Sequence, residues 1–248
     1  MEDFYSKYFD QQVKSYKGNL EDIYFRESSG RNNFIKKVFQ IMDIKPEEII
    51  LDAGCGVGNF IIPFSSRAKY VYAIDSSQES IKICEKRLAA KNISNVLTKV
   101  FSITNIPLKE NSVDKILCCS ILQYLTVPEI GLAIKEFSRV LKKNGALFIY
   151  FLNGDSPFGI SLSAARFFRT IINGKKKYQL TYVSFRKLKK EIEQKIGPVE
   201  ILDSQGFYLI LCPRYLKILL SKIESSRFFQ KVLGKYGLNL LIKARARK

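Results

Sequence analysis

The sequence contains no histidine, and this absence removes several classes of chemistry. Histidine is the usual general base near neutral pH and the commonest protein ligand of transition metals. A zinc site and a Ser-His-Asp hydrolase are therefore excluded, and we expect no metal. The five cysteines, at positions 55, 84, 118, 119 and 212, form no Cys-x-x-Cys pair and are odd in number. We expect free, buried thiols.

Long apolar runs are also missing. The two longest, Ala146–Leu152 and Phe207–Cys212, are far shorter than the roughly 20 residues that a membrane-spanning helix needs. The chain starts with the acidic Met1-Glu2-Asp3, and no apolar signal region follows. We therefore expect a cytoplasmic protein, and a chain of 248 residues suffices for one α/β domain with insertions.

The most informative segment is a glycine-rich turn that follows an apolar run. Residues 50–60 read Ile-Leu-Asp-Ala-Gly-Cys-Gly-Val-Gly-Asn-Phe, and a second apolar run, 70–74, ends at Asp75. Glycines let the backbone approach a ligand where a side chain would collide. Asp75 follows Gly54 by 21 residues, the spacing at which an acid after the second strand holds two ribose hydroxyls. The last glycine of the dinucleotide fingerprint is replaced by Asn59, which disfavours a pyrophosphate ligand.

This pattern resembles motif I of the class I S-adenosylmethionine-dependent methyltransferases, in the type 11-like group related to the ubiquinone and menaquinone enzymes. The resemblance implies S-adenosyl-L-methionine as cofactor, with the glycine turn facing its methionine half and Asp75 at its ribose. It covers the chain through about residue 152. The implied fold is a Rossmann-like α/β sheet of seven strands, the last antiparallel, with helices on both faces and helical insertions around strands five to seven.

Alternating apolar runs and amphipathic segments agree with that fold. We expect strands at 49–52, 70–75, 96–101, 113–119, 146–152, 199–203 and 238–244. We expect helices at 31–42, 58–66, 78–91, 128–141 and 183–196, with Asn144-Gly145 ending the fourth and Thr181 or Ser184 capping the fifth. The expected single domain, 1–248, divides into lid helices (1–45), the cofactor-binding core (46–152), acceptor or cap insertions with strand six (153–236), and the final strand with a basic tail (237–248).

The resemblance also assigns further site residues. Ser102 stands where the family usually has an acid for the adenine amino group, and Ile103 follows beside the ring. Gln123 and Tyr124 stand where related chains often have a histidine facing the methyl group, and they are the predicted catalytic residues. The predicted cofactor-binding residues are Asp52, Ala53, Gly54, Cys55, Gly56, Gly58, Asp75, Ser76, Ser102, Ile103, Ser120, Tyr16 and Arg31.

Positive charge is concentrated in the last two-fifths of the chain. Residues 1–150 carry 21 Lys and Arg against 17 Asp and Glu, a net charge of +4, whereas residues 151–248 carry 20 against 6, a net charge of +14. This segment includes Lys175-Lys176-Lys177 and an aliphatic helical face at Leu216, Leu219, Leu220 and Ile223. A basic and apolar surface of this kind fits an anionic membrane, an acidic substrate or a nucleic acid.

The predicted function is methyl transfer to a small-molecule or lipid-type hydrophobic acceptor. Methyl transfer from a sulfonium needs an in-line approach, so positioning supplies much of the rate. An RNA methyltransferase, favoured by charge, is one alternative; the Asn/Asp-Pro-Pro-aromatic turn and the Pro-Cys nucleophile of two such groups are absent from 118–124. A non-catalytic partner protein with the cofactor fold is the other alternative. DNA is not an expected partner, and the oligomeric state is left open.

Overall fold

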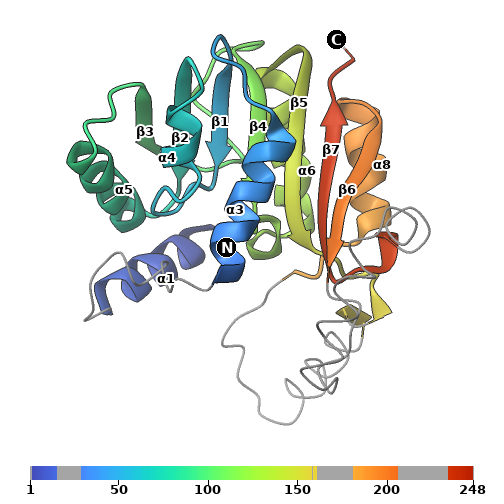
Figure 1. Cartoon of the computed structure of the whole chain (residues 1–248). Coiled ribbons are helices and arrows are strands. Elements are labelled where there is room, and N and C mark those ends of the chain that lie inside the picture. The colour runs from blue at the N-terminus through green and yellow to red at the C-terminus, as the bar shows by residue number, and fades with distance from the viewer. Residues whose placement is uncertain (1, 16–28, 158, 161–180, 206–233, 248) are drawn as a thin grey trace.

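Seven strands form one mixed sheet in the order β3-β2-β1-β4-β5-β7-β6. The computed structural model describes residues 2–15, 29–157, 159–160, 181–205 and 234–247. The strands are β1 (Ile49–Ala53), β2 (Tyr70–Asp75), β3 (Val96–Val100), β4 (Val113–Cys119), β5 (Leu141–Leu152), β6 (Val199–Gln205) and β7 (Asn239–Arg245). The first five are parallel, and β7 runs antiparallel between β5 and β6. This confirms the predicted Rossmann-like sheet (Figure 1).

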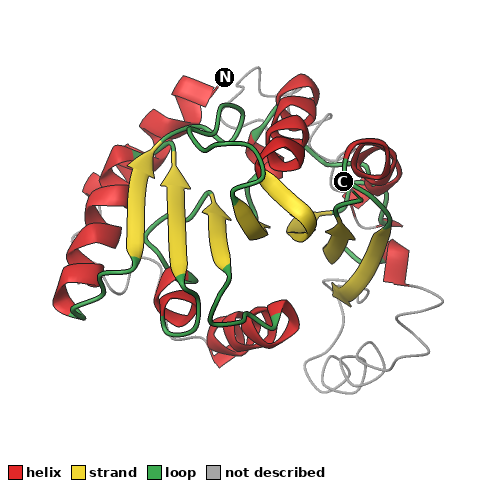
Figure 2. Ribbon diagram, turned by 90° about the horizontal axis from the view of Figure 1, so that it is seen from above, coloured by secondary structure: helices red, strands yellow, loops and turns green. Residues whose placement is uncertain are grey.

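Helices cover both faces of the sheet (Figure 2). Buried side chains of α3 (Ser29–Met42), α4 (Ile61–Ser65) and α5 (Gln78–Ala90) pack with one face, among them Val38, Phe64 and Ile81. Those of α6 (Val127–Val140) and α8 (Phe185–Lys195), such as Phe137 and Ile192, pack with the other. The remaining described helices are α1 (Glu2–Ser15) and the short 3-10 helices η1 (Leu122–Tyr124) and η2 (Gly234–Tyr236).

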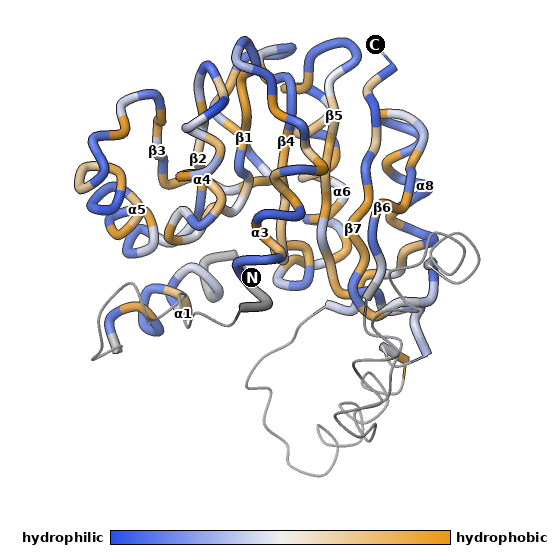
Figure 3. The backbone as a smooth tube through the Cα atoms, viewed as in Figure 1, coloured by the Kyte–Doolittle hydropathy of each residue, from blue (hydrophilic) through white to orange (hydrophobic). Residues whose placement is uncertain are grey.

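The central strands are apolar because they lie between these two helical layers. Along β1 every residue after Ile49 is buried, and β4 and β5 are buried over most of their length. Figure 3 shows the hydrophobic colour concentrated on these strands, while the helices alternate between hydrophobic and hydrophilic residues.

Local capping residues fix where the helices begin. Ser77 accepts a hydrogen bond from the backbone N–H of Ser80 at the start of α5, and Thr126 forms a capping box with Glu129 at the start of α6. Ser184, one of the two predicted caps, accepts from Lys187 at the start of α8. The other, Thr181, instead donates its hydroxyl to the carbonyl of Leu125 (2.6 Å).

The predicted end of the fourth helix is wrong. Helix α6 ends at Val140, and β5 begins at Leu141, which pairs with Val113, so Asn144 and Gly145 lie inside the strand. Asn144 takes a left-handed conformation (φ 61°) where the register between β4 and β5 shifts. A Cβ at Gly145 would come within 2.9 Å of the Asp114 carbonyl oxygen. The pair is therefore a strand irregularity and not a helix stop.

Two other predicted helices are shorter than expected. The predicted 58–66 helix is reduced to α4, because Gly58 at φ +84° is incompatible with a right-handed helix. The predicted 183–196 helix starts later because Val183 forms a parallel bridge with Asn153. The division of the chain into four functional segments stays a prediction, and Lys175–Lys177 and the aliphatic face at 216–223 lie outside the described residues.

The topology predicts where a ligand would lie. From β1 the chain continues to β2, the neighbour on one side of β1 in the strand order. From β4 it continues to β5, which lies in the opposite direction along that order. The carboxyl ends of β1 and β4 therefore border a switch point, where open α/β sheets have their ligand crevice. Helix α1 lies across this carboxyl edge of the sheet (Figure 1).

Candidate functional site

The turn after β1 is tied to the end of β2. The backbone N–H groups of Gly54 and Cys55 both donate to the carbonyl oxygen of Ile74, at 2.8 and 3.0 Å. The N–H of Gly56 donates to Oδ2 of Asp75 (2.8 Å), and Oδ1 of Asp75 accepts from the Ser77 N–H (2.9 Å). The acid therefore holds the turn in place while its side chain lines the adjoining cavity.

The three glycines of the turn have different roles, although all have positive φ. A Cβ on Gly54 would lie 2.3 Å from Cγ1 of Ile121, and one on Gly58 would lie 2.6 Å from Sγ of Cys84. These two glycines are required by packing. A Cβ on Gly56 would meet no protein atom within 4 Å. The space beside Gly56 is therefore available to a ligand.

A buried carboxyl group, Asp52, and a half-buried one, Asp75, lie at the two strand ends beside this turn. Asp52 is 1% exposed, and its Oδ2 has no hydrogen-bond partner among the described residues. Burial raises the pKa of Asp52 to about 8, and repulsion from Asp75 adds to the rise. Burial also raises the pKa of Asp75, against the hydrogen bonds from Ser77 and Gly56, which lower it. A donor supplied by a ligand would relieve the unpaired oxygen of Asp52.

A cavity of about 700 Å³ follows the carboxyl edge of the sheet. Its lining follows the strand order. Phe101 to Ile103 come after β3, Asp75 ends β2, and the glycine turn follows β1. Cys119 ends β4, Ser120 and Ile121 follow it, and Tyr150 lies near the end of β5. The volume is in the range of small-molecule sites. One side of the cavity thus belongs to the motif residues, and the other to β4 and β5.

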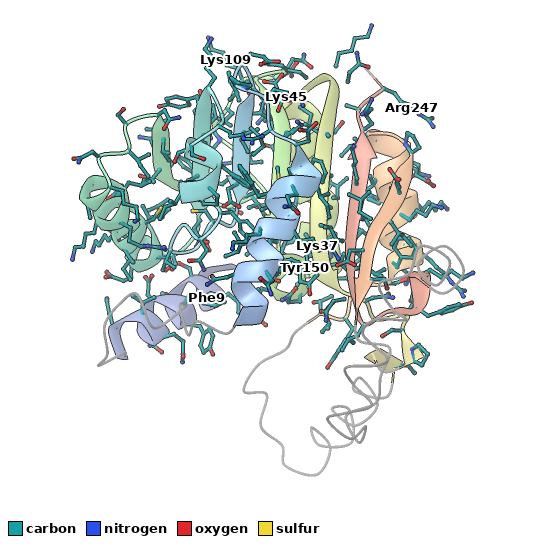
Figure 4. All side chains as sticks on the ribbon, viewed as in Figure 1. Phe9, Lys37, Lys45, Lys109, Tyr150 and Arg247 are labelled. Carbon is teal, nitrogen blue, oxygen red and sulfur yellow. The ribbon has the colours of Figure 1, made fainter. Side chains whose placement is uncertain are left out.

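Aromatic side chains enclose the β4 and β5 side. Tyr5 and Phe9 of α1 lie against Tyr124, with ring centroids 5.3 and 5.1 Å apart. Phe34 of α3 lies against Tyr150, with centroids 4.5 Å apart. These rings, with Phe60, all line the cavity. Figure 4 labels Phe9 and Tyr150 at this edge of the molecule.

Helix α1 is held by hydrogen bonds to the start of α5. Oδ1 of Asp10 accepts from the Ser77 hydroxyl (2.6 Å) and from the Glu79 N–H (3.1 Å). The Ser6 hydroxyl donates to the carbonyl oxygen of Ser76 (2.7 Å). Since Ser76 and Ser77 directly follow Asp75, the covering helix is attached to the acid-bearing strand.

The segment after β4 has an unusual backbone and a buried amide oxygen without a hydrogen-bond partner among the described residues. Ser120 has φ 59°, and its N–H donates to the Tyr150 carbonyl (2.8 Å). Oε1 of Gln123 is buried without a hydrogen-bond partner in the described part of the chain. Burial raises the pKa of Tyr124, and a hydrogen bond from Gln123 opposes this shift.

Most of the predicted site residues come together. Those that line the cavity are Gly54, Cys55, Gly56, Asp75, Ser76, Ser102, Ile103, Ser120 and Tyr124. The cavity lining does not include Asp52, Ala53, Gly58 or Gln123: Asp52 and Ala53 are buried at the end of β1, and Gln123 belongs to η1. Tyr16 lies outside the described residues, as does the side chain of Arg31 in α3. Their roles stay predictions.

Sequence reasoning placed Tyr5 and Phe9 in the predicted lid helices but did not assign them to the site. It missed Phe34, Phe60, Tyr150 and Cys119. The position of Tyr150 near the end of a parallel strand was the available signal, because such ends meet at one edge of the sheet. No comparable signal marks Phe34, since its place on α3 also fits an ordinary core position.

These residues fit S-adenosylmethionine. Gly56 leaves open space, Asp75 offers carboxylate oxygens to a ribose, and the unpaired Oδ2 of Asp52 is suited to an ammonium donor or a bridging water. Ser102, whose Oγ accepts from the Thr104 N–H (3.0 Å), and Ile103 border the cavity beyond β3, where the adenine was predicted.

Residues 50–145 match the sequence family described as methyltransferase domain. A probable cobalt-precorrin-6B C(15)-methyltransferase of Methanococcus vannielii is 43% identical over 54 residues, 22% of this chain and 30% of that protein. The chain thus aligns with less than a third of the length of such curated relatives.

Solved structures share the whole architecture at low identity. The YcgJ protein of Bacillus subtilis has a TM-score of 0.65 at 13% identity, covering 88% of this chain and 99% of its own. Geranyl diphosphate C-methyltransferase of Streptomyces coelicolor, solved with Mg²⁺, geranyl diphosphate and S-adenosyl-L-homocysteine, has a TM-score of 0.64 at 13% identity, covering 100% and 98%. Residues 50–145 thus match a methyltransferase domain, and the chain shares the fold of class I S-adenosylmethionine-dependent methyltransferases.

Proposed function

We propose that the protein transfers a methyl group from S-adenosylmethionine to a hydrophobic small-molecule or lipid-type acceptor. The observation that carries the choice of acceptor is the aromatic enclosure beside the motif residues, formed by Phe9, Phe34, Tyr124 and Tyr150. Such rings favour flat or aliphatic ligands by apolar burial. The acceptor would lie on the β4 and β5 side of the cavity, opposite the adenine side.

In this proposal the protein residues bind and orient. Asp75 would hold the ribose, the Gly56 backbone would allow close approach, and Asp52 would face the amino group of the methionine half, directly or through water. When bound, the cofactor supplies an electrophilic methyl group. Tyr5 and Phe9 would exclude water above the site, since α1 covers it.

The groups near the acceptor side are proton donors and not bases at neutral pH. Burial raises the pKa of the Cys119 thiol to about 12 and raises the pKa of Tyr124 and Tyr150 above the usual value for tyrosine. These groups would keep their protons and orient an acceptor by hydrogen bonds. The proposal therefore favours an acceptor atom that reacts without a strong protein base.

The experiment that tests this function is a comparison of extracts from a deletion strain and its parent. Mass spectrometry of lipids and small molecules should reveal a species in the deletion strain that lacks one methyl group, and the purified protein with S-adenosylmethionine should convert it. Undermethylated RNA with no altered small molecule would favour the RNA alternative. Cofactor binding without turnover on any extract would favour a non-catalytic partner protein.

We further propose peripheral association with an anionic membrane, where hydrophobic acceptors reside. The excess positive charge of residues 151–248 supports this part of the proposal. Within the described ranges, no helix is long and apolar enough to cross a bilayer.

A further inference from the structure

A second hollow, separate from the motif cavity, lies between α8 and η2. It has a volume of about 520 Å³, and we call it the basic groove. Its lining comes from α8, from η2 and from the turn after β5. The lining residues are Asp155, Phe185, Arg186, Lys189, Lys190, Glu193, Gln194, Lys235 and Tyr236. The groove shares no lining residue with the motif cavity.

The basic groove has an excess of positive charge. It contains four cationic and two acidic side chains. The Asp155 carboxylate is engaged by the helix start, because its Oδ2 accepts from the Ser184 hydroxyl and the Arg186 N–H, both at 3.0 Å. Glu193 lies 3.7 Å from Nζ of Lys189. Among the described residues no carboxylate pairs with Arg186, Lys190 or Lys235, so three cations are available to an anion.

The basic groove is also amphiphilic. Tyr236 is 39% exposed, and the ammonium group of Lys235 lies 5.0 Å from the centre of its ring. Tyrosine rings next to lysine and arginine are typical of the boundary between lipid headgroups and acyl chains. A free inorganic anion would make no use of this exposed ring.

The basic groove is on the same edge of the sheet as the motif cavity. Thr181, which precedes α8, donates its N–H to the carbonyl of Gln123 (2.7 Å) and its hydroxyl to that of Leu125 (2.6 Å). Leu125 lines the motif cavity, and Arg186 of the groove is five residues beyond Thr181, at most about 18 Å of extended chain.

We propose that the basic groove binds the phosphate headgroups of anionic lipids and so places the motif cavity against the membrane surface. The inference specifies the membrane partner within the proposed function and uses no step of methyl transfer. It predicts that association depends on the positions of a few cations and not on the total charge of the protein.

The test is flotation with vesicles of phosphatidylcholine alone or mixed with phosphatidylglycerol. The groove variant is Lys190→Glu with Lys235→Glu, one residue from each element. The matched control is Lys45→Glu with Lys109→Glu, which makes the same charge change at the opposite edge of the sheet (Figure 4). The wild-type protein should float with the anionic vesicles at low salt, lose this binding at high salt, and remain unbound with neutral vesicles.

The groove variant should partition at least tenfold less to anionic vesicles, and the control variant should lose less than twofold. Equal losses in the two variants, or no loss in either, would overturn the proposal. Inorganic phosphate could also be added as a competitor. If it displaces the protein from the vesicles in proportion to its own occupancy of the groove, the ligand of the groove is a soluble phosphate instead. Loss of binding to structured RNA in the groove variant, without any vesicle binding by the wild type, would assign the groove to RNA.

Calorimetry with S-adenosylhomocysteine separates this result from failure of the proposed function. Both variants should bind it as the wild type does, because neither pair of lysines lines the motif cavity. If the groove variant has lost its fold, the milder variant Lys190→Gln with Lys235→Gln replaces it in the flotation experiment. We expect this variant to show an intermediate loss of vesicle binding. Vesicle binding equal to that of the wild type would count against the groove.

Discussion

Gly54 and Gly56 of the turn are needed for different reasons. Gly54 and Gly56 both have positive φ, so an alanine at either position carries a similar backbone cost of about 1–2 kcal/mol. Only at Gly54 does the added methyl group collide with protein, at Ile121. The two substitutions therefore separate packing from ligand binding.

Gly56→Ala should leave the protein folded but abolish measurable binding of S-adenosylhomocysteine, because the methyl group would occupy the ligand's space. Gly54→Ala should lower the urea midpoint far more. Calorimetry and urea unfolding measure the two effects. Normal binding by a folded Gly56→Ala protein would place the ligand elsewhere.

Asp52 should make stability depend on pH. Its pKa is about 8 in the folded state and near 3.8 in the unfolded chain, so the folded state holds an extra proton between these values. The contribution of Asp52 to the free energy of unfolding is therefore fully present at low pH and is lost as the pH rises toward 8. Asp52→Asn removes this loss of stability at higher pH, because the amide resembles the protonated acid in shape and does not ionise.

Without ligand, the stability advantage of Asp52→Asn should grow by about 1 kcal/mol per pH unit between pH 5 and 7, as measured by urea unfolding. The same variant should bind S-adenosylhomocysteine more weakly, by about 1.5–3 kcal/mol, the cost of losing a hydrogen bond to a charged group. A constant stability difference across this pH range would refute the assigned pKa.

Tyr150 lines the proposed acceptor side of the cavity. Tyr150→Phe keeps the ring against Phe34 and removes only the hydroxyl. We expect affinity for S-adenosylhomocysteine within twofold of wild type, and kcat/KM for the acceptor about tenfold lower, since one hydrogen bond is worth about 1.4 kcal/mol. Steady-state kinetics on the acceptor found by the extract comparison measure this effect; unchanged kcat/KM would remove Tyr150 from the acceptor side.

At the scale of elements, strands with strong local signals were predictable. The predicted bounds of β2 and β4 match the structure, because each is an apolar run that ends next to polar residues. The start of β5 was not predictable, since Asn144-Gly145 forms a helix stop in most contexts and only pairing with β4 and contact with Ala246 keep it in a strand.

The motif side of the cavity was predictable because its residues are contiguous in sequence. The aromatic side was not, because Phe34 and Tyr150 are more than a hundred positions apart and meet only through the packing of α3 on the sheet. Aromatic residues in an amphipathic helix usually serve the core, so their pattern carries no information about a ligand.

Helix α1 should be a removable cover. Asp10→Ala deletes two hydrogen bonds that join α1 to the start of α5, while the sheet keeps its core. We expect faster amide hydrogen exchange in residues 2–15 and affinity for S-adenosylhomocysteine weaker by about 1.5–3 kcal/mol. Asp43→Ala, an exposed acid before β1, is the control and should change neither. Unchanged exchange in the Asp10 variant would show that the remaining contacts of α1, the Ser6 hydrogen bond and the aromatic rings among them, are enough to hold it.

At the scale of the whole molecule, the ligand features gather at one edge of the sheet. The glycine turn, the aromatic enclosure and the basic groove all lie toward the carboxyl ends of the parallel strands, whereas Lys45, Lys109 and Arg247 lie toward the other edge (Figure 4). This asymmetry follows from parallel strands, whose carboxyl ends and following loops share one side.

The most direct test of the central claim is calorimetric titration of the purified protein with S-adenosylhomocysteine, with NAD as the comparison ligand. The account predicts saturable binding of S-adenosylhomocysteine without added metal, no binding of NAD, and affinity lower by roughly 1.5–3 kcal/mol in Asp75→Ala, which loses the acid proposed to hold the ribose. Tight binding of NAD with no response to S-adenosylhomocysteine would contradict it.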